Sequence, residues 1–477
     1  MGWPNYHQDG TLPFPKTRRP FLSLTPLSSM MSLRMTDIRS LSQDELITVI
    51  VEEFDTELQH LRRATPSAES VGLASGDTHD SPSYRLYGAD AAEVNRTMLS
   101  IFALRWILTG DYKAFTEAQP ESTKLSRESF QQMSTFFIQC LPTLNDVYLL
   151  VIATIVADIG KDPSLAGEIQ QHSGRKVAGN HDYLVYEAAK LDLIPCLAIG
   201  KLDDADREDI LLGLEFAAKF NIPQLAQAEN VPGSLRAVAS FKSRSRAIQL
   251  KVLEVFLDVA GAAAQRSMEG SLTMTEDVYH TYMITIEALM EFIHDPMITE
   301  TQCYNKILKA KSDATAGKGF GKTLNPEKPS DRALLRLLCM GRVSTIEMAH
   351  HYETAFYQLD IYHHDLVTRL NATGLTEDDP AIIPYYAPAL FARVMVIWHD
   401  QVEQQDNGQQ WLVSALSYTM RFLSVICKPV SCEIGSMNTG YVQERNLDFA
   451  LQKLAAPGSN AELLERLSSL VADFEVG

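Results

Sequence analysis

The sequence predicts an all-α fold, in which a single large helical domain of about fifteen helices follows a disordered N-terminal head. Apolar residues recur with helical spacing from residue 42 onward, and strand-like alternation is nearly absent. The chain has 477 residues, of which 45% are hydrophobic and 21% are charged. That balance is typical of globular proteins, and the length suffices for one large core or two smaller ones.

The head is expected to span residues 1–38 and the helical domain residues 39–477. The opening stretch MGWPNYHQDGTLPFPKTRRPFLSLTPLSS is rich in Pro and Ser and has no apolar periodicity. It lacks the long apolar core of a signal peptide, and a weak mitochondrial presequence is the alternative.

The first helix is predicted to begin at Ser42, because Glu45 follows at the spacing of a capping box. Loops are predicted at 65–83, by its Ser, Gly and Asp content, and at 311–331, which is rich in Gly and Lys. A split at the second loop into two helical lobes is the alternative to one domain. Helices are predicted at 42–63, 90–110, 126–141, 144–158, 182–199, 205–220, 234–265, 276–294, 300–311, 329–340, 343–370, 387–403, 409–427, 443–454 and 460–474.

Composition excludes several classes of function. The net charge of −18 argues against a nucleic-acid surface, which needs a basic face. Six scattered cysteines without a CxxC pair predict reduced thiols and a cytoplasmic protein. The longest apolar run, VYLLVIATIVA (147–157), falls short of the roughly 18–20 residues of a membrane span. The oligomeric state stays open.

A group of polar residues follows that apolar run, and this group is the strongest functional signal. Asp158, Lys161 and Asp162 stand at its end, and Asn180-His181-Asp182 opens the next helix. Charges at the end of a buried helix are costly unless a metal ion or a phosphate neutralises them. Oxygen ligands of this kind suit Mg²⁺.

Two simpler interpretations of the same residues remain open. Asn180 or Asp182 caps the next helix, and Asp158 and Lys161 form a solvated pair. The helix either continues through Gly160 or is ended by a turn at Pro163.

The segment ATIVADIGKDP is similar to the signature of HD phosphohydrolases, in which an apolar helix ends in a metal-binding His-Asp pair. Here Ala157 occupies the His position and cannot bind a metal. An active HD enzyme is therefore disfavoured, and a relic of such a site in a non-enzymatic helical scaffold remains the alternative function.

The segments ADIGKDPSLA and GNHDYLVYEAAKLDLIPCL together resemble the atypical fungal class I terpene cyclases that make humulene in tropolone sesquiterpenoid pathways. The resemblance runs over most of 40–477, and the quoted motifs lie in 150–200. It implies a Mg²⁺-dependent sesquiterpene cyclase, a carbon–oxygen lyase that converts farnesyl diphosphate to a humulene-type hydrocarbon and releases diphosphate. The implied metal shell of two Mg²⁺ ions is Asp158, Asp162, Asn180, His181 and Asp182, with Lys161 near the phosphates.

The ordinary class I motifs are missing. The acidic run DDADRED (203–209) has Arg207 at its fifth position, so it is not a DDxxD motif and more simply caps a helix. This departure excludes an ordinary terpene synthase and is compatible with the atypical family.

In that family an essential lysine follows, by one helical turn, an apolar residue that gates product geometry. Two pairs in this chain have that spacing, Ile307/Lys311 and Val238/Lys242. Lys311 is favoured, because it borders the predicted loop 311–331, which would close over the substrate.

Other patterns carry less weight. The pairs Glu291/His294 and Glu347/His350 have the spacing of a di-iron motif, but about one such pair is expected by chance in a chain with 12 histidines, and two are unremarkable. A carbocation pocket needs aromatic ring faces, and seven aromatic side chains on predicted apolar faces are candidates. They are Trp106, Phe136, Phe137, Tyr282, Phe292, Trp398 and Trp411.

Overall fold

The structure is a computed structural model that describes residues 33–64, 81–177, 179–241, 244–403, 405–429, 441–455 and 459–475. These residues are almost entirely helical, which confirms the predicted all-α fold. One continuous cluster of buried apolar side chains runs from Leu33 to Val471. Because the helices share this core, they form a single domain.

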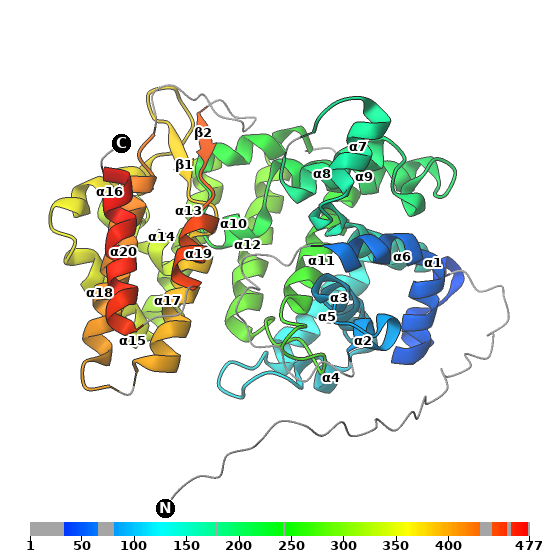
Figure 1. The fold of residues 1–477 in the computed structure, drawn as a ribbon, viewed down its shortest axis with the longest axis horizontal. Helices are drawn as coiled ribbons and strands as arrows, with labels where there is room; N and C mark the ends of the chain where they lie inside the picture. The colour runs from blue at the N-terminus through cyan, green and yellow to red at the C-terminus, as the bar shows by residue number, and fades with distance from the viewer. Residues whose placement is uncertain are drawn as a thin grey trace, which may run out of the picture.

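The helices form two groups with a central set between them (Figure 1). Helix α11 packs on α3, α6 and α9, and these elements form the core of the N-terminal group. The N-terminal group comprises η1 (Leu33–Met35), η2 (Ile38–Ser40), α1 (Gln43–Arg63), α2 (Pro82–Tyr87), α3 (Ala92–Thr109), α4 (Tyr112–Thr116), α5 (Arg127–Cys140), α6 (Leu144–Val156), η4 (Ile159–Lys161), α7 (Leu165–Ser173), α8 (His181–Lys190), η5 (Pro195–Leu197), α9 (Asp204–Lys219) and α11 (Ser245–Gly261).

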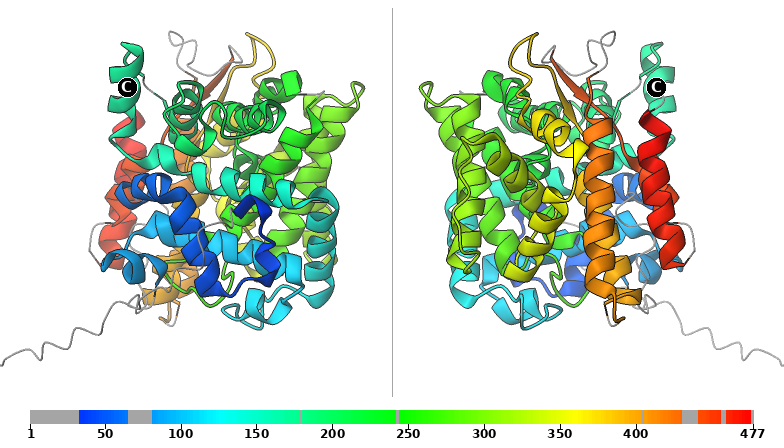
Figure 2. Two further views of the ribbon diagram at one scale, coloured as in Figure 1. Left: turned by 90° about the vertical axis from the view of Figure 1, so that its right-hand side faces the viewer. Right: turned by 90° about the vertical axis from the view of Figure 1, so that its left-hand side faces the viewer.

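The remaining elements form the centre and the C-terminal group. Helix α12 packs on α10 and α13, and α13 continues the contact to α14. Helices α18 and α20 lie side by side on the outer face (Figure 2). These elements are α10 (Ile222–Ala226), η6 (Pro232–Phe241), α12 (Glu276–His294), α13 (Glu300–Gly317), α14 (Pro329–Met340), α15 (Ile346–Tyr357), α16 (Ile361–Asn371), β1 (Ala381–Ile383), α17 (Ala387–Gln401), α18 (Gly408–Ile426), β2 (Val442–Glu444), α19 (Asp448–Ala455) and α20 (Asn460–Glu475).

Local sequence explains how the chain reaches the charged segment after α6. Thr143 and Asp146 form a capping box that starts α6, and the helix is apolar on nearly all sides, so it is buried. It ends at Val156 and passes into the short 3-10 helix η4. Gly160 lies so close to α8 that a Cβ atom there would overlap the His181 carbonyl oxygen. Glycine therefore lets η4 approach the start of α8.

The structure has more helices than the sequence predicts. Twenty α-helices lie in the described residues, against about fifteen expected. Four of the additional helices, α2, α4, α7 and α10, have five to nine residues, too few for a recognisable apolar period. The segment 343–370, expected as one helix, is divided into α15 and α16.

Two predicted loops change as well. Residues 65–80 of the first lie outside the described residues, but Pro82 already begins α2. The second was expected to start at residue 311, whereas α13 continues to Gly317 and places Lys311 inside a helix. A two-stranded parallel sheet, β1 with β2, pairs Ala381 with Val442 and was not expected from the sequence.

The packed domain begins earlier than residue 39. Leu33 is 1% exposed and its amide donates to Glu53 Oε2 at 2.9 Å. Arg34 reaches Asn145 Oδ1 at 2.9 Å and Asp203 Oδ2 at 2.7 Å. The stretch from residue 33 to 38 therefore contacts α1, α6 and the start of α9 and belongs to the domain.

In the part of the chain described, no single helix has both the length and the apolar character to cross a membrane. Helix α5 and the segment Leu144–Lys161 meet that test only as a pair, and they are bent by 108° relative to each other.

We expect Leu33→Ala to lower the free energy of unfolding by roughly 2 kcal/mol, because it removes a buried side chain that anchors the start of the domain. Met35→Ala is the matched control, since Met35 is 75% exposed. Guanidinium unfolding measures both. Equal midpoints for the two variants would show that the segment does not contribute to the core.

Candidate functional site

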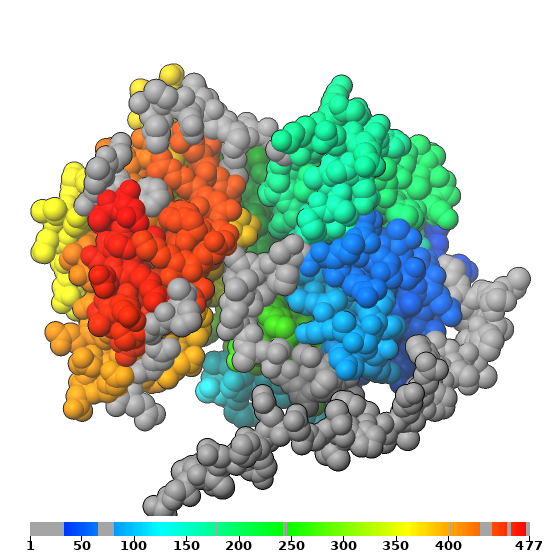
Figure 3. Space-filling model, in the orientation of Figure 1, coloured from blue at the N-terminus to red at the C-terminus, as the bar shows by residue number. Residues whose placement is uncertain are grey.

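A cavity of about 410 Å³ lies between the two groups of helices. Its N-terminal side is formed by residues of α3, η4, α8 and α11, and its other side by residues of α10, α12, α13, the α14–α15 connection and the start of α17. The volume is within the range of small-molecule sites. On the face shown in Figure 3 a furrow separates the two groups.

A cluster of ion pairs forms the N-terminal end of the cavity. Lys161 Nζ lies 3.0 Å from Glu93 Oε2 and 2.8 Å from Asp158 Oδ1. Arg96 Nη1 lies 3.3 Å from the same Glu93 oxygen, and Arg96 Nη2 lies 2.9 Å from Asp258 Oδ1. These five side chains, here called the ion cluster, connect α3, α11 and the segment after α6.

The ion cluster fixes the charge of its members. Burial would raise the pKa of Asp158, but Lys161, Arg96 and His181 outweigh it and hold that pKa below its usual value. Burial and Arg96 oppose the charge of Lys161, but Asp158 and Glu93 raise its pKa. Burial raises the pKa of Glu93 against the opposing effect of Arg96. Asp158 and Lys161 are therefore an ionised pair at neutral pH.

His181 lies between two carboxylates. Its Nε2 is 3.9 Å from Asp158 Oδ1 and 3.6 Å from Asp182 Oδ2. Asn180 is turned away from them, because its side chain caps α8 by accepting a hydrogen bond from the Tyr183 amide at 2.9 Å. The capping interpretation of Asn180 is thus the one the structure supports.

These residues fit a Mg²⁺ ion only in part. Among the described residues no three His, Cys, Asp or Glu side chains are grouped closely enough to hold a metal by themselves. Mg²⁺ usually takes one or two carboxylates and completes its shell with water and substrate phosphates. Asp158 and Asp182, on either side of His181, supply two carboxylates of this kind, of which Asp158 lines the cavity and Asp182 lies behind His181.

Asp162 is separated from the other expected ligands. The turn of η4 directs it toward α1, where its Oδ2 lies 2.8 Å from His60 Nδ1 and 2.8 Å from Arg63 Nη2. The amide and hydroxyl of Ser164 also donate to its Oδ1. Burial would raise its pKa, but these partners lower it. Asp162 joins α1 to η4 and does not line the cavity.

The pair Ile307 and Lys311 lines the opposite side of the cavity from α13. Ile307 is 4% exposed, and Lys311 Nζ donates to the Val343 carbonyl at 2.5 Å. Lys311 makes no ion pair with any residue that the structure describes, and burial lowers its pKa. Of the alternative pair, Val238 is buried away from the cavity and Lys242 lies outside the described residues.

A buried arginine shapes the wall formed by the residues after α10. Arg336 donates to the carbonyls of Ala228, Glu229 and Asn230 at 2.9–3.0 Å. Glu229 lines the cavity and accepts a hydrogen bond from the Ala387 amide at 2.9 Å. Arg336 thus ties α14 to this wall, and Glu229 ties the start of α17 to it.

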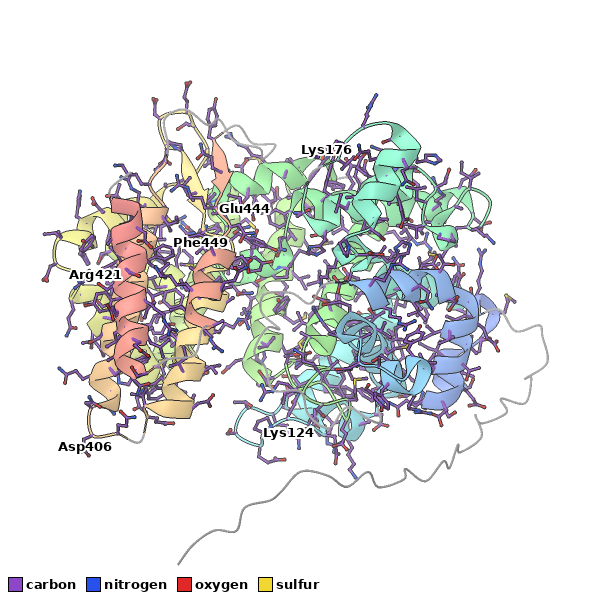
Figure 4. The ribbon with its side chains drawn as sticks, in the orientation of Figure 1. Lys124, Lys176, Asp406, Arg421, Glu444 and Phe449 are labelled. Atoms are coloured by element: carbon purple, nitrogen blue, oxygen red, sulfur yellow. The ribbon has the colours of Figure 1, made fainter. Side chains whose placement is uncertain are left out.

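The small sheet supports a pair of tyrosines at the cavity. Glu444 on β2 (Figure 4) accepts a hydrogen bond from Gln224, a lining residue, at 3.3 Å. Tyr385 follows β1, and its ring centroid lies 4.0 Å from that of Tyr386. Burial, with smaller effects of Tyr386 and Asp182, raises the pKa of Tyr385, so its hydroxyl stays neutral.

Several lining residues were not predicted from the sequence. Arg96 and Asp258 lie on α3 and α11, far from the quoted motifs, although charges within otherwise apolar helices are a signal for them. Of the seven aromatic candidates only Tyr282 lines the cavity, whereas Tyr385 and Tyr386 do so without having been expected.

We expect Asp162→Asn to lower the free energy of unfolding by about 1.5 kcal/mol, because a buried carboxylate loses its charged partners. The depressed pKa means that this stabilisation is complete above about pH 4 and is lost as the pH falls toward the folded-state pKa. The difference from the wild type should therefore shrink in acid.

Chemical unfolding at several pH values checks this, with Asp313→Asn as control, since that exposed pair with Lys309 contributes little. A variant that keeps its stability but loses ligand binding would show that Asp162 acts at the cavity site and not as a link between α1 and η4.

No curated protein and no solved structure matches this chain. Residues 47–458 match a family described as a family of unknown function, DUF6829. The match covers most of the chain, including every element that forms the cavity. The protein therefore belongs to the DUF6829 family.

Proposed function

We propose that this protein is a Mg²⁺-dependent cyclase that converts farnesyl diphosphate to a humulene-type hydrocarbon and releases diphosphate. The observation that supports it is that one cavity joins Asp158, Lys161 and His181 to Ile307 and Lys311. These two groups are far apart in the sequence, and the resemblance assigns one to the metal and the other to the leaving group.

The charge of the cavity supports a ligand that brings a cation with it. Around Lys161 and Arg96 lie the carboxylates of Glu93, Asp158 and Asp258, and Asp182 stands on the far side of His181. The carboxylates outnumber the basic groups. Asp158 and Asp182 would hold Mg²⁺ here, and the ion supplies positive charge where the departing diphosphate gains negative charge.

The chain's own residues would do the rest. Lys161 is fixed by Glu93 and Asp158, so it orients the Asp158 carboxylate rather than moving with the ligand. Among the described residues, the Val343 carbonyl alone holds the Lys311 ammonium, so the ammonium can turn toward a phosphate.

Apolar side chains would enclose the isoprenoid tail. Val259, Val278, Ile284 and Ile307 line the cavity. Such a lining excludes water, which would otherwise capture a carbocation. The ring faces of Tyr282 and of the other tyrosines that line the cavity can stabilise positive charge by their quadrupole.

We expect Asp158→Asn and Asp182→Asn each to lower turnover of farnesyl diphosphate at least about a hundredfold, because an amide is a weaker Mg²⁺ ligand than a carboxylate. Gas chromatography of volatiles and release of diphosphate measure the reaction, and chelation of Mg²⁺ should abolish it. Asp204→Asn is the control, since Asp204 is exposed in the DDADRED run. Absence of any Mg²⁺-dependent diphosphate release by the wild type would favour the alternative of a non-enzymatic scaffold.

We expect Lys311→Met to abolish turnover while substrate binding persists in weakened form, because the change keeps the side-chain stem and removes the charge. Ile307→Ala should change the product mixture and retain part of the activity. Val238→Ala is its control, since Val238 is equally buried but does not line the cavity. Lys242→Met tests the other lysine. Full turnover of both lysine variants would show that other groups hold the diphosphate.

A further inference from the structure

The wall of the cavity opposite the ion cluster carries three basic side chains, Lys311, Lys318 and Arg342, here called the basic wall. Lys311 Nζ donates to the Val343 carbonyl at 2.5 Å, and Lys318 Nζ donates to the Ser344 carbonyl at 2.9 Å. Two ammonium groups thus meet consecutive carbonyls of the short segment between α14 and α15. Like charges on one wall repel each other, and an anion bound between them would offset that repulsion.

The basic wall is only partly neutralised by the protein. Asp277 pairs with Lys318, its carboxylate oxygens lying 2.9 and 3.1 Å from Nζ. Lys311 and Arg342 make no ion pair within the part of the chain that the structure describes. Arg342 instead donates to Gln227 Oε1 at 3.3 Å. A net positive surface on a cavity is notable in a chain whose net charge is −18.

The backbone of Arg342 has a left-handed conformation, which is unfavourable for a residue that carries a side chain. Its φ is +49°, just after the end of α14, where glycine is the usual residue. A side chain costs about 1 kcal/mol in this left-handed region. Glycine would form the same turn more easily, whereas the arginine present here brings a guanidinium to the cavity lining.

Helix α15 adds donors to the same wall. Its capping residue Thr345 and its first residue Ile346 both line the cavity. The amides of the first helical turn have no partner within the helix, and the helix dipole places partial positive charge there. This end of the cavity therefore combines three cationic side chains with the positive end of a twelve-residue helix.

We propose that the basic wall is an oxyanion site that binds a phosphate or diphosphate group without a metal ion. It is separate from Asp158 and Asp182, and its binding requires no reaction. It shares Lys311 with the proposed cyclase and extends that function by naming Lys318 and Arg342 as further anion-binding groups, but the binding itself requires neither the metal nor turnover. The same chemistry suits free inorganic diphosphate and the diphosphate of an isoprenoid, and direct binding measurements separate the two.

The test is titration calorimetry of the full chain with inorganic diphosphate in the presence of a chelator. We expect saturable binding at one site. Lys318→Gln and Arg342→Gln should each weaken it about tenfold or more, since each removes a charged donor. Asp277→Asn should tighten binding, because it removes the carboxylate that competes for Lys318.

Lys309→Gln is the matched control, because Lys309 is on the same helix but is exposed and outside the cavity lining. It should leave the dissociation constant unchanged. Tighter binding of an alkyl diphosphate than of inorganic diphosphate would assign the site to the isoprenoid ligand, and equal binding would assign it to the free anion. Both outcomes support the oxyanion site.

Binding that appears only with Mg²⁺, or that weakens equally in Lys309→Gln, would overturn the proposal. It would leave the cyclase hypothesis standing, because that hypothesis uses the metal. Conversely, metal-independent binding by a protein that does not turn over farnesyl diphosphate would support the oxyanion site and reject the cyclase.

Discussion

Burial of the Lys161 ammonium is the constraint on which the site depends. A cation at the end of an apolar helix is stable only between carboxylates, and Glu93 and Asp158 provide them. Glu93 lies on α3, and Arg96 of the same helix pairs with its carboxylate. The Arg96 guanidinium also reaches Asp258 on α11. Removal of one partner from a buried pair costs roughly 3–5 kcal/mol, so the cluster holds these three segments in fixed positions.

The two ends of the cavity have opposite charge, and this separation limits what can bind. The ion cluster and Asp182 together contain four carboxylates and two basic side chains, whereas the basic wall contains three basic side chains beside one carboxylate, Asp277. Apolar residues such as Val259 and Ile284 also line the cavity. Because charges interact strongly where water is excluded, a neutral apolar ligand alone would leave both ends unsatisfied. A cation together with a phosphate group matches both.

Local patterns in the sequence predicted much of the fold. The capping box of Ser42 and the helical spacing of Ile307 and Lys311 are both present in the structure. Interactions between segments that are distant in the sequence could not be predicted, because no local pattern encodes them. The 3-10 turn after α6 sends Asp162 away from Asp158, although a continuous helix would have placed both on one face. Strand β1 forms only because β2, some sixty residues later in the chain, pairs with it.

The pairing of Asp158 with Lys161 has a consequence for any metal at this site. The carboxylate has lone pairs beyond those that face the ammonium, so it can still coordinate an ion. Its depressed pKa keeps it ionised, as a ligand has to be. Lys161 also repels a divalent cation at short range. The ammonium cannot move away from such a cation, because its carboxylate partners hold it in place. Asp158 and Asp182 would therefore hold Mg²⁺ weakly until an anion enters beside it. Under the proposed function, the site would bind metal and diphosphate together rather than store a metal ion.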